Sequence, residues 1–270
     1  MTHRPPRPFR VLASALAAGA LLTTAACADG DDSGPERADT TEISSSPLAQ
    51  ASPAALTQAG ARAALVTEAD LEDDWTQVKN AATWRDSLLV GQVDVADFLT
   101  GKADAADCQK LLDRLYDDEL LGKPSGASAL TGFKEGESRL LYQVAAYDKA
   151  ALDTSFAWLK SLPVKCDQFT VKDSSGGQRT VQVVGATLPK EGDARQGLQV
   201  TVRGTSGGEP TTLTLDVAAL RVGTDAITFT NGGLDGADDD TTEQAAKLGT
   251  ARLEDVQAGR TPSADPSEID

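Results

Sequence analysis

The sequence predicts an α+β fold, in which helices pack on an antiparallel meander sheet within a single disulfide-stapled domain. Three observations predict it. Helical and β-prone stretches alternate between residues 103 and 161, five further β-prone stretches follow, and a last helical stretch closes the region. About 200 residues lie between a polar N-terminal segment and a short polar tail, which is enough for one domain with a substantial core.

The first predicted helix covers residues 103–121. Its apolar positions recur at i, i+3, i+4 and i+7, so they share one face. These positions are Cys108, Leu111, Leu112 and Leu115. Gly122 and Pro124 are expected to end the helix. Cys108 therefore lies on the side that faces the core.

A strand and a second helix follow. Residues 139–147 are β-prone, Asp148 is a suitable N-cap, and one apolar face extends the helix to Ser161. Pro163 is expected to stop this helix, and Cys166 comes shortly after it.

Five β-prone segments separated by turn residues predict an antiparallel meander. The segments are residues 169–172, 179–188, 197–203, 211–221 and 226–230. The last helix is predicted over residues 241–257. Asp240 and Glu243 have capping-box spacing at its start, and Gly259 lies just past its end.

Residues 1–26 have the pattern of a secretory signal peptide. Arg4, Arg7 and Arg10 form a basic start without acids, and residues 11–22 form an almost purely apolar run. An uncleaved membrane anchor is the alternative, but a helix needs about 20 apolar residues to cross a bilayer, and this run is shorter.

Cys27 follows the apolar run directly after Ala25 and Ala26. This arrangement resembles the lipobox of bacterial lipoproteins, although Thr24 stands where the pattern favours Leu. The resemblance implies that Cys27 receives a diacylglyceryl group and becomes the N-terminus after cleavage. Two acyl chains are enough to hold a protein on a membrane. We therefore expect a protein anchored by lipid to the extracytoplasmic face of the cell membrane.

The charge and histidine content exclude several functions. Without residues 1–26 the chain has 22 basic and 41 acidic residues, and it loses its one histidine, His3. The absence of histidine excludes Ser-His-Asp and Cys-His catalysis and every histidine-ligated metal site. The acidic excess repels phosphate backbones, so we expect no nucleic-acid partner.

Two segments are predicted to be disordered. Residues 27–61 are rich in Ser, Thr, Ala, Asp and Pro, which is typical of an acidic tether that cannot bury enough apolar surface to fold. Residues 260–270 have two prolines and three acids and form a tail. The folded domain is thus predicted over residues 62–259.

Two cysteines remain once Cys27 carries the lipid. Cys108 and Cys166 are then expected to pair as a disulfide, since the exported chain lies in an oxidising compartment. The alternatives are a redox couple or two buried free thiols. A redox couple usually has Cys-x-x-Cys spacing, which this chain lacks.

The order of these elements resembles a known family. The stretch Leu65-Val66-Thr67-Glu68-Ala69-Asp70-Leu71 leads to Trp75, Asp107-Cys108 follows on a helix, and a strand, a helix, Cys166 and a five-stranded meander complete the pattern. The pattern over residues 64–256 is similar to the extracellular sensor domain of PknH-type actinobacterial receptor kinases and of stand-alone lipoproteins with that domain. The resemblance implies a ligand-binding or sensing module with a cleft and no catalysis. Many members have two disulfides, whereas this chain allows one.

Three function classes remain open. A non-catalytic binding or sensing domain for a cell-envelope or small-molecule ligand is favoured, and no cofactor is expected. A hydrolase that cleaves cell-wall glycan with two carboxylates is the second class. A structural scaffold that binds a partner protein is the third. Four acids are candidates for the hydrolase and are explained at least as well by solvated faces or helix caps: Asp107, Glu119, Asp148 and Asp216.

A cation site is conceivable where acids crowd the loop before the last helix. Oxygen-rich loops suit Ca²⁺, but the spacing does not match an EF-hand. The favoured interpretation is that these acids stabilise the positive N-terminal end of the helix dipole. The candidate ligands are Asp235, Asp238, Asp239 and Asp240.

The tryptophans were considered as ligand contacts. Trp158 lies on a helix that should pack against the sheet, so it is expected in the core. Trp75 and Trp84 lie in a stretch of weaker periodicity and are candidates to line a cleft.

Overall fold

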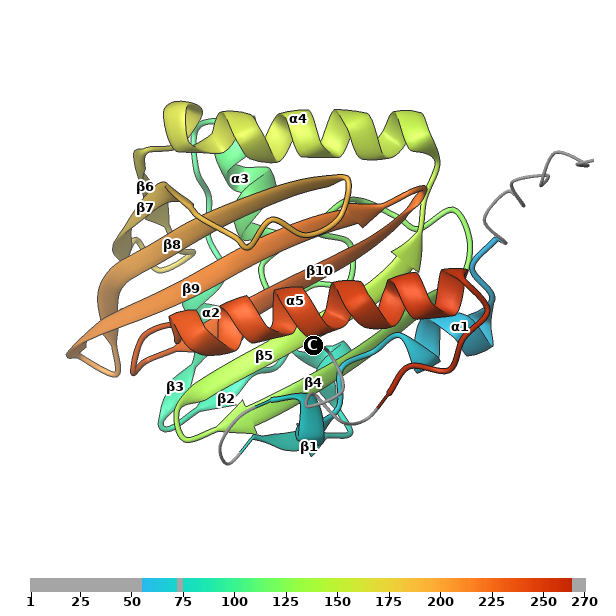
Figure 1. The fold of residues 1–270 in the computed structure, drawn as a ribbon. Helices are drawn as coiled ribbons and strands as arrows, with labels where there is room; N and C mark the ends of the chain where they lie inside the picture. Colours follow the sequence, from blue (N-terminus) through green and yellow to red (C-terminus); the bar gives the residue numbers. More distant parts are fainter. Residues whose placement is uncertain (1–54, 72–74, 264–270) are drawn as a thin grey trace, which may run out of the picture. The chain divides into compact units, whose positions relative to one another are not determined.

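A computed structural model describes residues 55–71 and 75–263. Figure 1 shows that a twisted sheet with helices on both of its faces forms this part of the chain. The signal peptide, Cys27, most of the tether and most of the tail lie outside the described residues. Within the described residues, no helix has both the length and the apolar character that a membrane span requires.

The main sheet has eight antiparallel strands in the order β1-β4-β5-β10-β9-β8-β7-β6. The five strands from β6 to β10 are neighbours in chain order, which confirms the predicted meander. The bounds are β1 Thr76–Val78, β4 Ser128–Glu135, β5 Ser138–Ala146, β6 Gln168–Lys172, β7 Gln178–Ala186, β8 Ala194–Ser206, β9 Glu209–Val222 and β10 Asp225–Gly233. A separate hairpin pairs β2 Leu89–Val90 with β3 Val93–Asp94.

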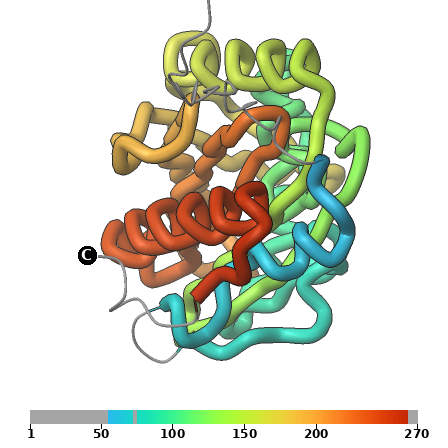
Figure 2. The backbone as a smooth tube through the Cα atoms, turned by 45° about the vertical axis from the view of Figure 1, so that its right-hand side comes forward, coloured from blue at the N-terminus to red at the C-terminus, as the bar shows by residue number. Residues whose placement is uncertain are grey.

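Helices cover both faces of the sheet. The core of one face includes side chains from α2, α3 and α4, and the core of the other includes side chains from α5 and from the segment that follows α1. Figures 1 and 2 show α4 and α5 separated by the strands. The helices are α1 Gln58–Ala63, α2 Val95–Leu99, α3 Ala106–Leu112, α4 Lys149–Lys165 and α5 Asp239–Gln257, with 3₁₀ turns at Glu68–Asp70 and Ala81–Thr83.

β5 shows why the central strands are apolar on both sides. Leu141 and Ala145 belong to the core under α3 and α4, whereas Leu140, Tyr142 and Val144 belong to the core under α5. Successive side chains of a strand point to opposite faces, so a strand buried on both sides needs an apolar run. The sheet is therefore the middle of three layers.

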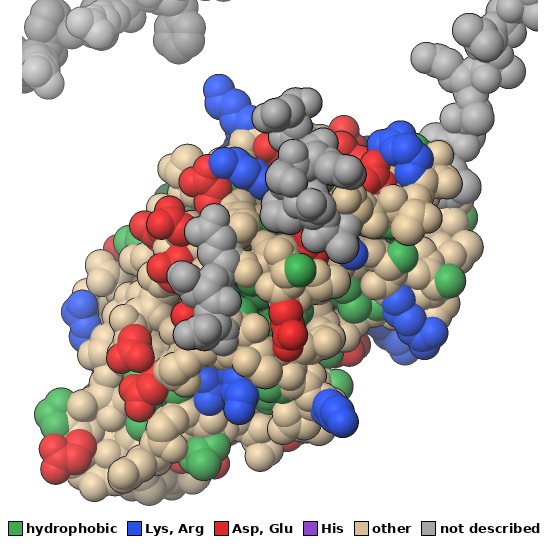
Figure 3. Space-filling view, turned by 60° about the horizontal axis from the view of Figure 1, so that its bottom comes forward, with side chains coloured by type: hydrophobic (Ala, Val, Ile, Leu, Met, Phe, Trp, Pro, Cys, Tyr) green, Lys and Arg blue, Asp and Glu red, His purple; other side chains and the backbone are tan. Residues whose placement is uncertain are grey.

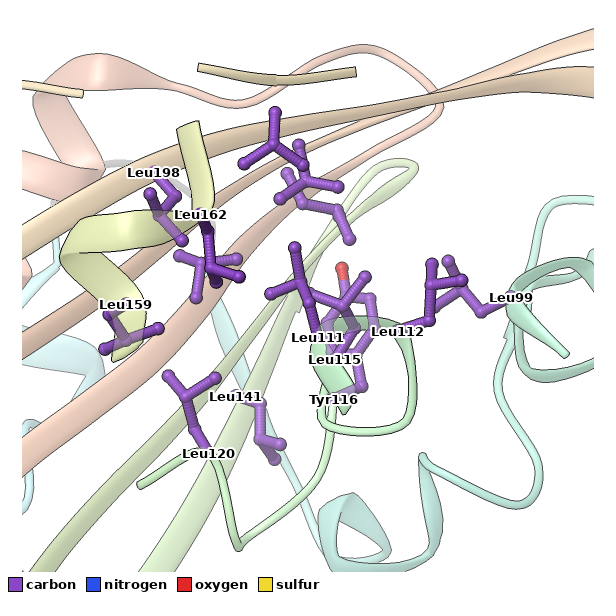
Figure 4. Close-up of a cluster of buried hydrophobic side chains, with 14 of the residues drawn as sticks. Leu99, Leu111, Leu112, Leu115, Tyr116, Leu120, Leu141, Leu159, Leu162 and Leu198 are labelled. Carbon is purple, nitrogen blue, oxygen red and sulfur yellow. The ribbon is translucent and has the colours of Figure 1, made fainter. Parts of the chain in front are cut away.

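The core under α3 and α4 is rich in leucine. Figure 4 shows leucines of α3 and α4 directed toward leucines of β5 and β8. Leu111, Leu159, Leu162 and Leu198 are at most 1% exposed. Burying a leucine side chain stabilises a fold by about 1.5–3 kcal/mol, so this core is a major source of stability.

The first predicted helix is shorter than expected. α3 ends at Leu112, although Leu115 and Leu120 beyond it are still buried. Tyr116 has φ +54°, a left-handed conformation that interrupts a right-handed helix. Its buried hydroxyl donates to the Gly232 carbonyl of β10 at 2.8 Å, which favours this turn over another helical turn.

The second predicted helix is longer than expected. α4 continues through Pro163 to Lys165 instead of stopping before the proline. Proline removes one backbone donor from a helix, but the N–H of Cys166 still donates to the Leu162 carbonyl at 2.7 Å. The last turn of α4 thus keeps a backbone hydrogen bond to Cys166, which is one of the two disulfide cysteines.

The ends of α5 differ in how well they were predicted. Asp238, not Asp240, is the N-cap, and its side chain accepts from the Thr241 N–H at 2.7 Å. Gly259 follows the helix with φ +73°, as expected of a glycine just past a helix end.

The folded part begins within the segment assigned to the tether. α1 starts at Gln58 and buries Ala61 completely. The Thr57 hydroxyl accepts from the Gly60 N–H at 3.0 Å, and the Gln58 amide donates to the Ser128 carbonyl of β4 at 2.6 Å. A cap and a contact distant in sequence therefore order residues whose composition alone indicates disorder.

α5 approaches the sheet closely at Gly249. A Cβ built at this position would lie 1.7 Å from the hydroxyl oxygen of Tyr142 on β5. Tyr142 stacks on Phe229 of β10 with ring centroids 5.9 Å apart. Three residues further along α5, Arg252 pairs with the buried carboxylate of Asp70 at 3.2 Å. The C-terminal half of α5 is thus fixed by close packing and a shielded ion pair.

Cys108 and Cys166 form the predicted disulfide, with 5.6 Å between their Cα atoms. The bond joins α3 to the residue that ends α4. Both cysteines are about 1% exposed and belong to the core under these helices. The disulfide therefore joins two elements of one core that are 58 residues apart in the sequence.

Replacing both cysteines by serine is expected to lower the free energy of unfolding by about 4 kcal/mol, because a loop of this length restricts the unfolded chain strongly. Urea unfolding of the full chain with and without reductant checks this value. Reductant should weaken the wild type and leave the double variant unchanged. A wild type insensitive to a reductant that demonstrably opens the bond would contradict the prediction.

Candidate binding pocket

A pocket of about 500 Å³ opens on the face of the sheet that carries α5. One wall is the end of β7 and the loop after it, the opposite wall is the first turn of α5, and β8 and β9 form the floor. The lining residues are Val184, Gly185, Ala186, Thr187, Leu188, Pro189, Gln199, Asp216, Asp239, Thr242 and Glu243.

The pocket exists because α5 does not extend over the whole face. α5 packs on β9 and β10, and Figure 1 shows β7 and β8 continuing beyond it. The apolar core under α5 includes Ala218 and Leu220 of β9, but no residue within β7 or β8. The uncovered strands and the side of the helix thus form two sides of a hollow.

The floor belongs to a row of aligned side chains that crosses four strands. Val184 of β7 is paired with Gln199 of β8, Gln199 with Asp216 of β9, and Asp216 with Asn231 of β10. Directly paired residues point to the same face of a sheet. The row continues into Leu140 of β5 beneath α5. Polar side chains therefore occupy the part of the row from β8 to β10, and an apolar one follows under the helix.

Asp216 is the central charged group of this floor, although it is only 3% exposed. Its Oδ2 accepts from the Thr242 hydroxyl at 2.9 Å, and its Oδ1 accepts from the Gln199 amide at 3.5 Å. Burial raises the pKa of the Asp216 carboxyl above its usual range. The two hydrogen bonds oppose this rise, and the nearby charges of Asp239 and Asp238 add to it.

A buried polar network joins Asp216 to the start of α5. The Asn231 amide donates to the Thr242 hydroxyl and to the Asp238 carbonyl, each at 3.0 Å. Asp238 is the residue that caps α5. The carbonyl oxygen of the Asn231 side chain is buried and has no hydrogen-bond partner among the described residues. The first turn of α5 is thus held by polar contacts, unlike its tightly packed C-terminal half.

The charge of the pocket is negative. Three of its lining residues are acids, and none is Lys or Arg. Glu243 pairs with Lys247 one turn further along α5. Within the described part of the chain, neither Asp216 nor Asp239 has an ion pair with Lys or Arg. Two carboxylates in the pocket therefore lack a cationic partner.

The structure places the predicted site residues differently. Trp75 is 4% exposed and lies in the core under α5, and Trp84 is 3% exposed and lies in the core of the opposite face. Neither lines the pocket. Trp84 packs edge-on against Tyr116 with ring centroids 5.9 Å apart, so its role is core packing. Trp158 is in the core, as expected.

The four acids considered for a cation are distributed over separate roles. Asp238 caps α5, Asp239 and Asp240 lie in its first turn, and Asp235 is exposed in the preceding loop. In the described ranges, no three His, Cys, Asp or Glu side chains are grouped so that they could hold a metal ion. Asp238, Asp239 and Asp240 thus lie where acids stabilise a helix dipole, whereas Asp235 lies outside the helix start.

Asp216 requires a correction, because sequence analysis explained it as a solvated or capping residue. On β9 the side chains that share its face are Thr212, Thr214, Ala218 and Leu220. The face thus changes from polar to apolar at Asp216, which was the available signal. A residue at such a boundary lies where the helix that covers the sheet ends. In the structure, Asp216 lies at the edge of the area covered by α5, and the pocket begins there.

Three kinds of comparison place this chain among known proteins. No protein-family model and no curated protein sequence matches it. Its structure is similar to the extracellular domain of PknH from Mycobacterium tuberculosis, with a TM-score of 0.44 and 14% identity over 77% of this chain and 98% of that one. The similarity concerns the arrangement of the backbone and transfers no residue role.

The Asp216→Asn variant tests the electrostatics of the pocket. Because the folded pKa of Asp216 lies above its unfolded value of about 3.9, the wild type loses stability as pH rises through and above this value. Asn keeps an acceptor for Thr242 but carries no charge. The free energy of unfolding of the variant, relative to that of the wild type, should therefore increase as the pH rises from 3 to 7. Urea unfolding at several pH values measures this difference.

The exposed Asp104→Asn variant is the matched control, since it removes the same charge from the surface. Its stability should follow that of the wild type across the same pH range. A stability difference between Asp216→Asn and the wild type that does not change with pH would contradict the assigned pKa direction.

Proposed function

We propose that the protein is an extracytoplasmic, lipid-anchored binding protein whose folded domain takes up a small ligand without catalysis. The observation that carries this proposal is the pocket with the buried, ion-pair-free carboxylate of Asp216 at its floor. Burying a charge is unfavourable unless it gains a partner. Binding sites are places where such a cost is retained, because a ligand supplies the missing interaction.

The extracytoplasmic location is supported by the disulfide. Disulfides persist in oxidising compartments and are rare in reducing cytosol. The bond between Cys108 and Cys166 uses two of the three cysteines, which leaves Cys27 for lipid attachment. The signal-peptide pattern and the small residues before Cys27 support the same location, and the membrane is the partner of the anchor.

Binding is favoured over the other two function classes. A scaffold protein needs no concave pocket, whereas this domain has one that is deep enough to bury Asp216. A hydrolase would use two carboxylates that flank a scissile bond, and the turnover test below distinguishes it from a binding protein. The hydrogen bonds from Thr242 and Gln199 hold Asp216 in place, as suits a fixed recognition group.

Val184→Trp is expected to block ligand uptake. Val184 lines the pocket and is 43% exposed, so a larger side chain fills the pocket without disturbing the core. A thermal-shift screen of the full chain with cell-wall fragments and small metabolites should yield compounds that stabilise the wild type. Mass action gives about 2.7 kcal/mol at one hundred times the dissociation constant. Those compounds should not stabilise Val184→Trp.

Val164→Trp is the matched control, because Val164 is 85% exposed on α4 and does not line the pocket. It should respond to ligands like the wild type. Hits that stabilise both variants equally would place binding elsewhere. Turnover of a screened glycan that is lost in Asp216→Asn would replace the binding function by hydrolysis.

Cys27→Ser is expected to release the protein from the membrane. Serine cannot form the thioether to the lipid, so the variant should move from the membrane fraction to the soluble extracytoplasmic fraction. Mass spectrometry of the wild-type N-terminal peptide should show the added diacylglyceryl group. A wild-type peptide of unmodified mass would contradict the lipid anchor.

A further inference from the structure

We infer that the pocket binds an organic cation, with an ammonium group on Asp216 and Asp239 and an apolar body along the wall formed by β7 and the following loop. This inference rests on the proposed binding function and adds the chemical class of the ligand. It follows from the charge of the pocket, the free acceptor sites on Asp216, the apolar wall, and the way the start of α5 is occupied.

Asp216 has acceptor capacity to spare. An ionised carboxylate offers about four lone-pair sites, and within the described residues Asp216 accepts from Thr242 and Gln199. The 3.5 Å contact between the Gln199 amide and Oδ1 is at the limit of hydrogen bonding. Because Asp216 lines the pocket, its carboxylate is the acceptor that the floor offers to a donor there. An ammonium group has three N–H donors and a positive charge, and both match this carboxylate.

Asp239 adds a second acceptor to the pocket. It lies in the first turn of α5, is exposed, and lines the pocket without an ion pair among the described residues. Asp216 and Asp239 line the same pocket, and the charge of Asp239 adds to the rise in the pKa of Asp216. A cation between the two groups would remove this repulsion. Glu243 contributes less, because Lys247 already pairs with it.

The opposite wall is apolar. Val184 and Ala186 come from β7, and Leu188 and Pro189 come from the loop after it. Val184 is one of three large hydrophobic side chains that are exposed in the described part of the chain. On the face drawn in Figure 3, hydrophobic side chains form small patches between charged ones. An apolar wall beside unpaired carboxylates thus fits an amphipathic amine better than a fully polar ion.

An anionic ligand does not fit, although helix N-termini often bind anions. The Asp238 carboxylate already accepts from the Thr241 N–H, and Asp239 and Asp240 further offset the helix dipole. Asp216 and Asp239 would repel a carboxylate or phosphate in the pocket. The start of α5 is therefore satisfied from within the chain, and the negative charge that remains faces the pocket.

Three probes that share one apolar body test the charge requirement: 4-phenylbutylamine, 4-phenylbutanol and 4-phenylbutyrate. Isothermal titration of the full chain at pH 7 and low salt measures their affinities. The amine should bind about tenfold or more tightly than the alcohol, as expected for a charge-assisted hydrogen bond, and the carboxylate should not bind. Added salt should weaken the amine and leave the alcohol unchanged.

Two variants locate the cation. Asp216→Asn and Asp239→Asn should each lower the amine's affinity toward that of the alcohol, and Asp239 is exposed, so its substitution does not affect the core. Asp104→Asn removes one surface charge and should leave the affinity unchanged. If all three variants lowered the affinity for the amine equally, the amine would be bound by the overall negative charge of the domain and not by the pocket, and the inference would be overturned.

The outcomes separate this inference from the proposed function. Equal binding of alcohol and amine, both blocked by Val184→Trp, would keep the binding function and overturn the cation requirement. The same holds if none of the three probes binds while another screened compound is blocked by Val184→Trp. Amine binding that survives Val184→Trp would overturn the inference, because the cation would then bind outside the pocket.

Discussion

The fold depends on one geometric constraint: one long helix, α5, is the main cover of one face of an eight-stranded sheet. An α-helix with its side chains is about 10–12 Å wide, and neighbouring strands are about 4.8 Å apart, so one helix covers two or three strands. α5 covers β9 and β10, and the segment after α1 adds Ala64 and Val66 toward the edge at β1. β7 and β8 are left bare on that side. The pocket is a direct result of this shortage of cover.

The opposite face of the sheet is covered by more elements. α2, α3 and α4 share it with the turns that follow α3, and the disulfide joins two of these elements. The two faces of the sheet thus have different roles in the domain. One face holds the larger core and the covalent crosslink, and the other holds a smaller core next to a charged hollow. Burying the Asp216 carboxylate lowers the stability of the fold. The core and the disulfide of the opposite face supply stability that offsets this loss.

β-prone segments and helical patterns predicted much of this architecture. The strands from β6 to β10 correspond to β-prone segments separated by turn residues, so their pairing followed from chain order. β4 was missed because Gly132 interrupts its pattern, and this glycine is required where Ala81 and Trp84 pack against the strand. The disulfide followed from the number of cysteines. The pocket could not be predicted, because it depends on which strands α5 leaves uncovered, and this is decided by packing distant in sequence.

The contact between Gly249 and Tyr142 also constrains how this domain can vary. The Tyr142 hydroxyl is buried and has no hydrogen-bond partner among the described residues, so it contributes volume and no polar bond. Any side chain at position 249 would compete for that volume. The two positions therefore form one unit of sequence change: a larger residue on the helix becomes compatible with the fold only after the side chain on the strand has become smaller or its ring has shifted. In related sequences, these two positions should vary together.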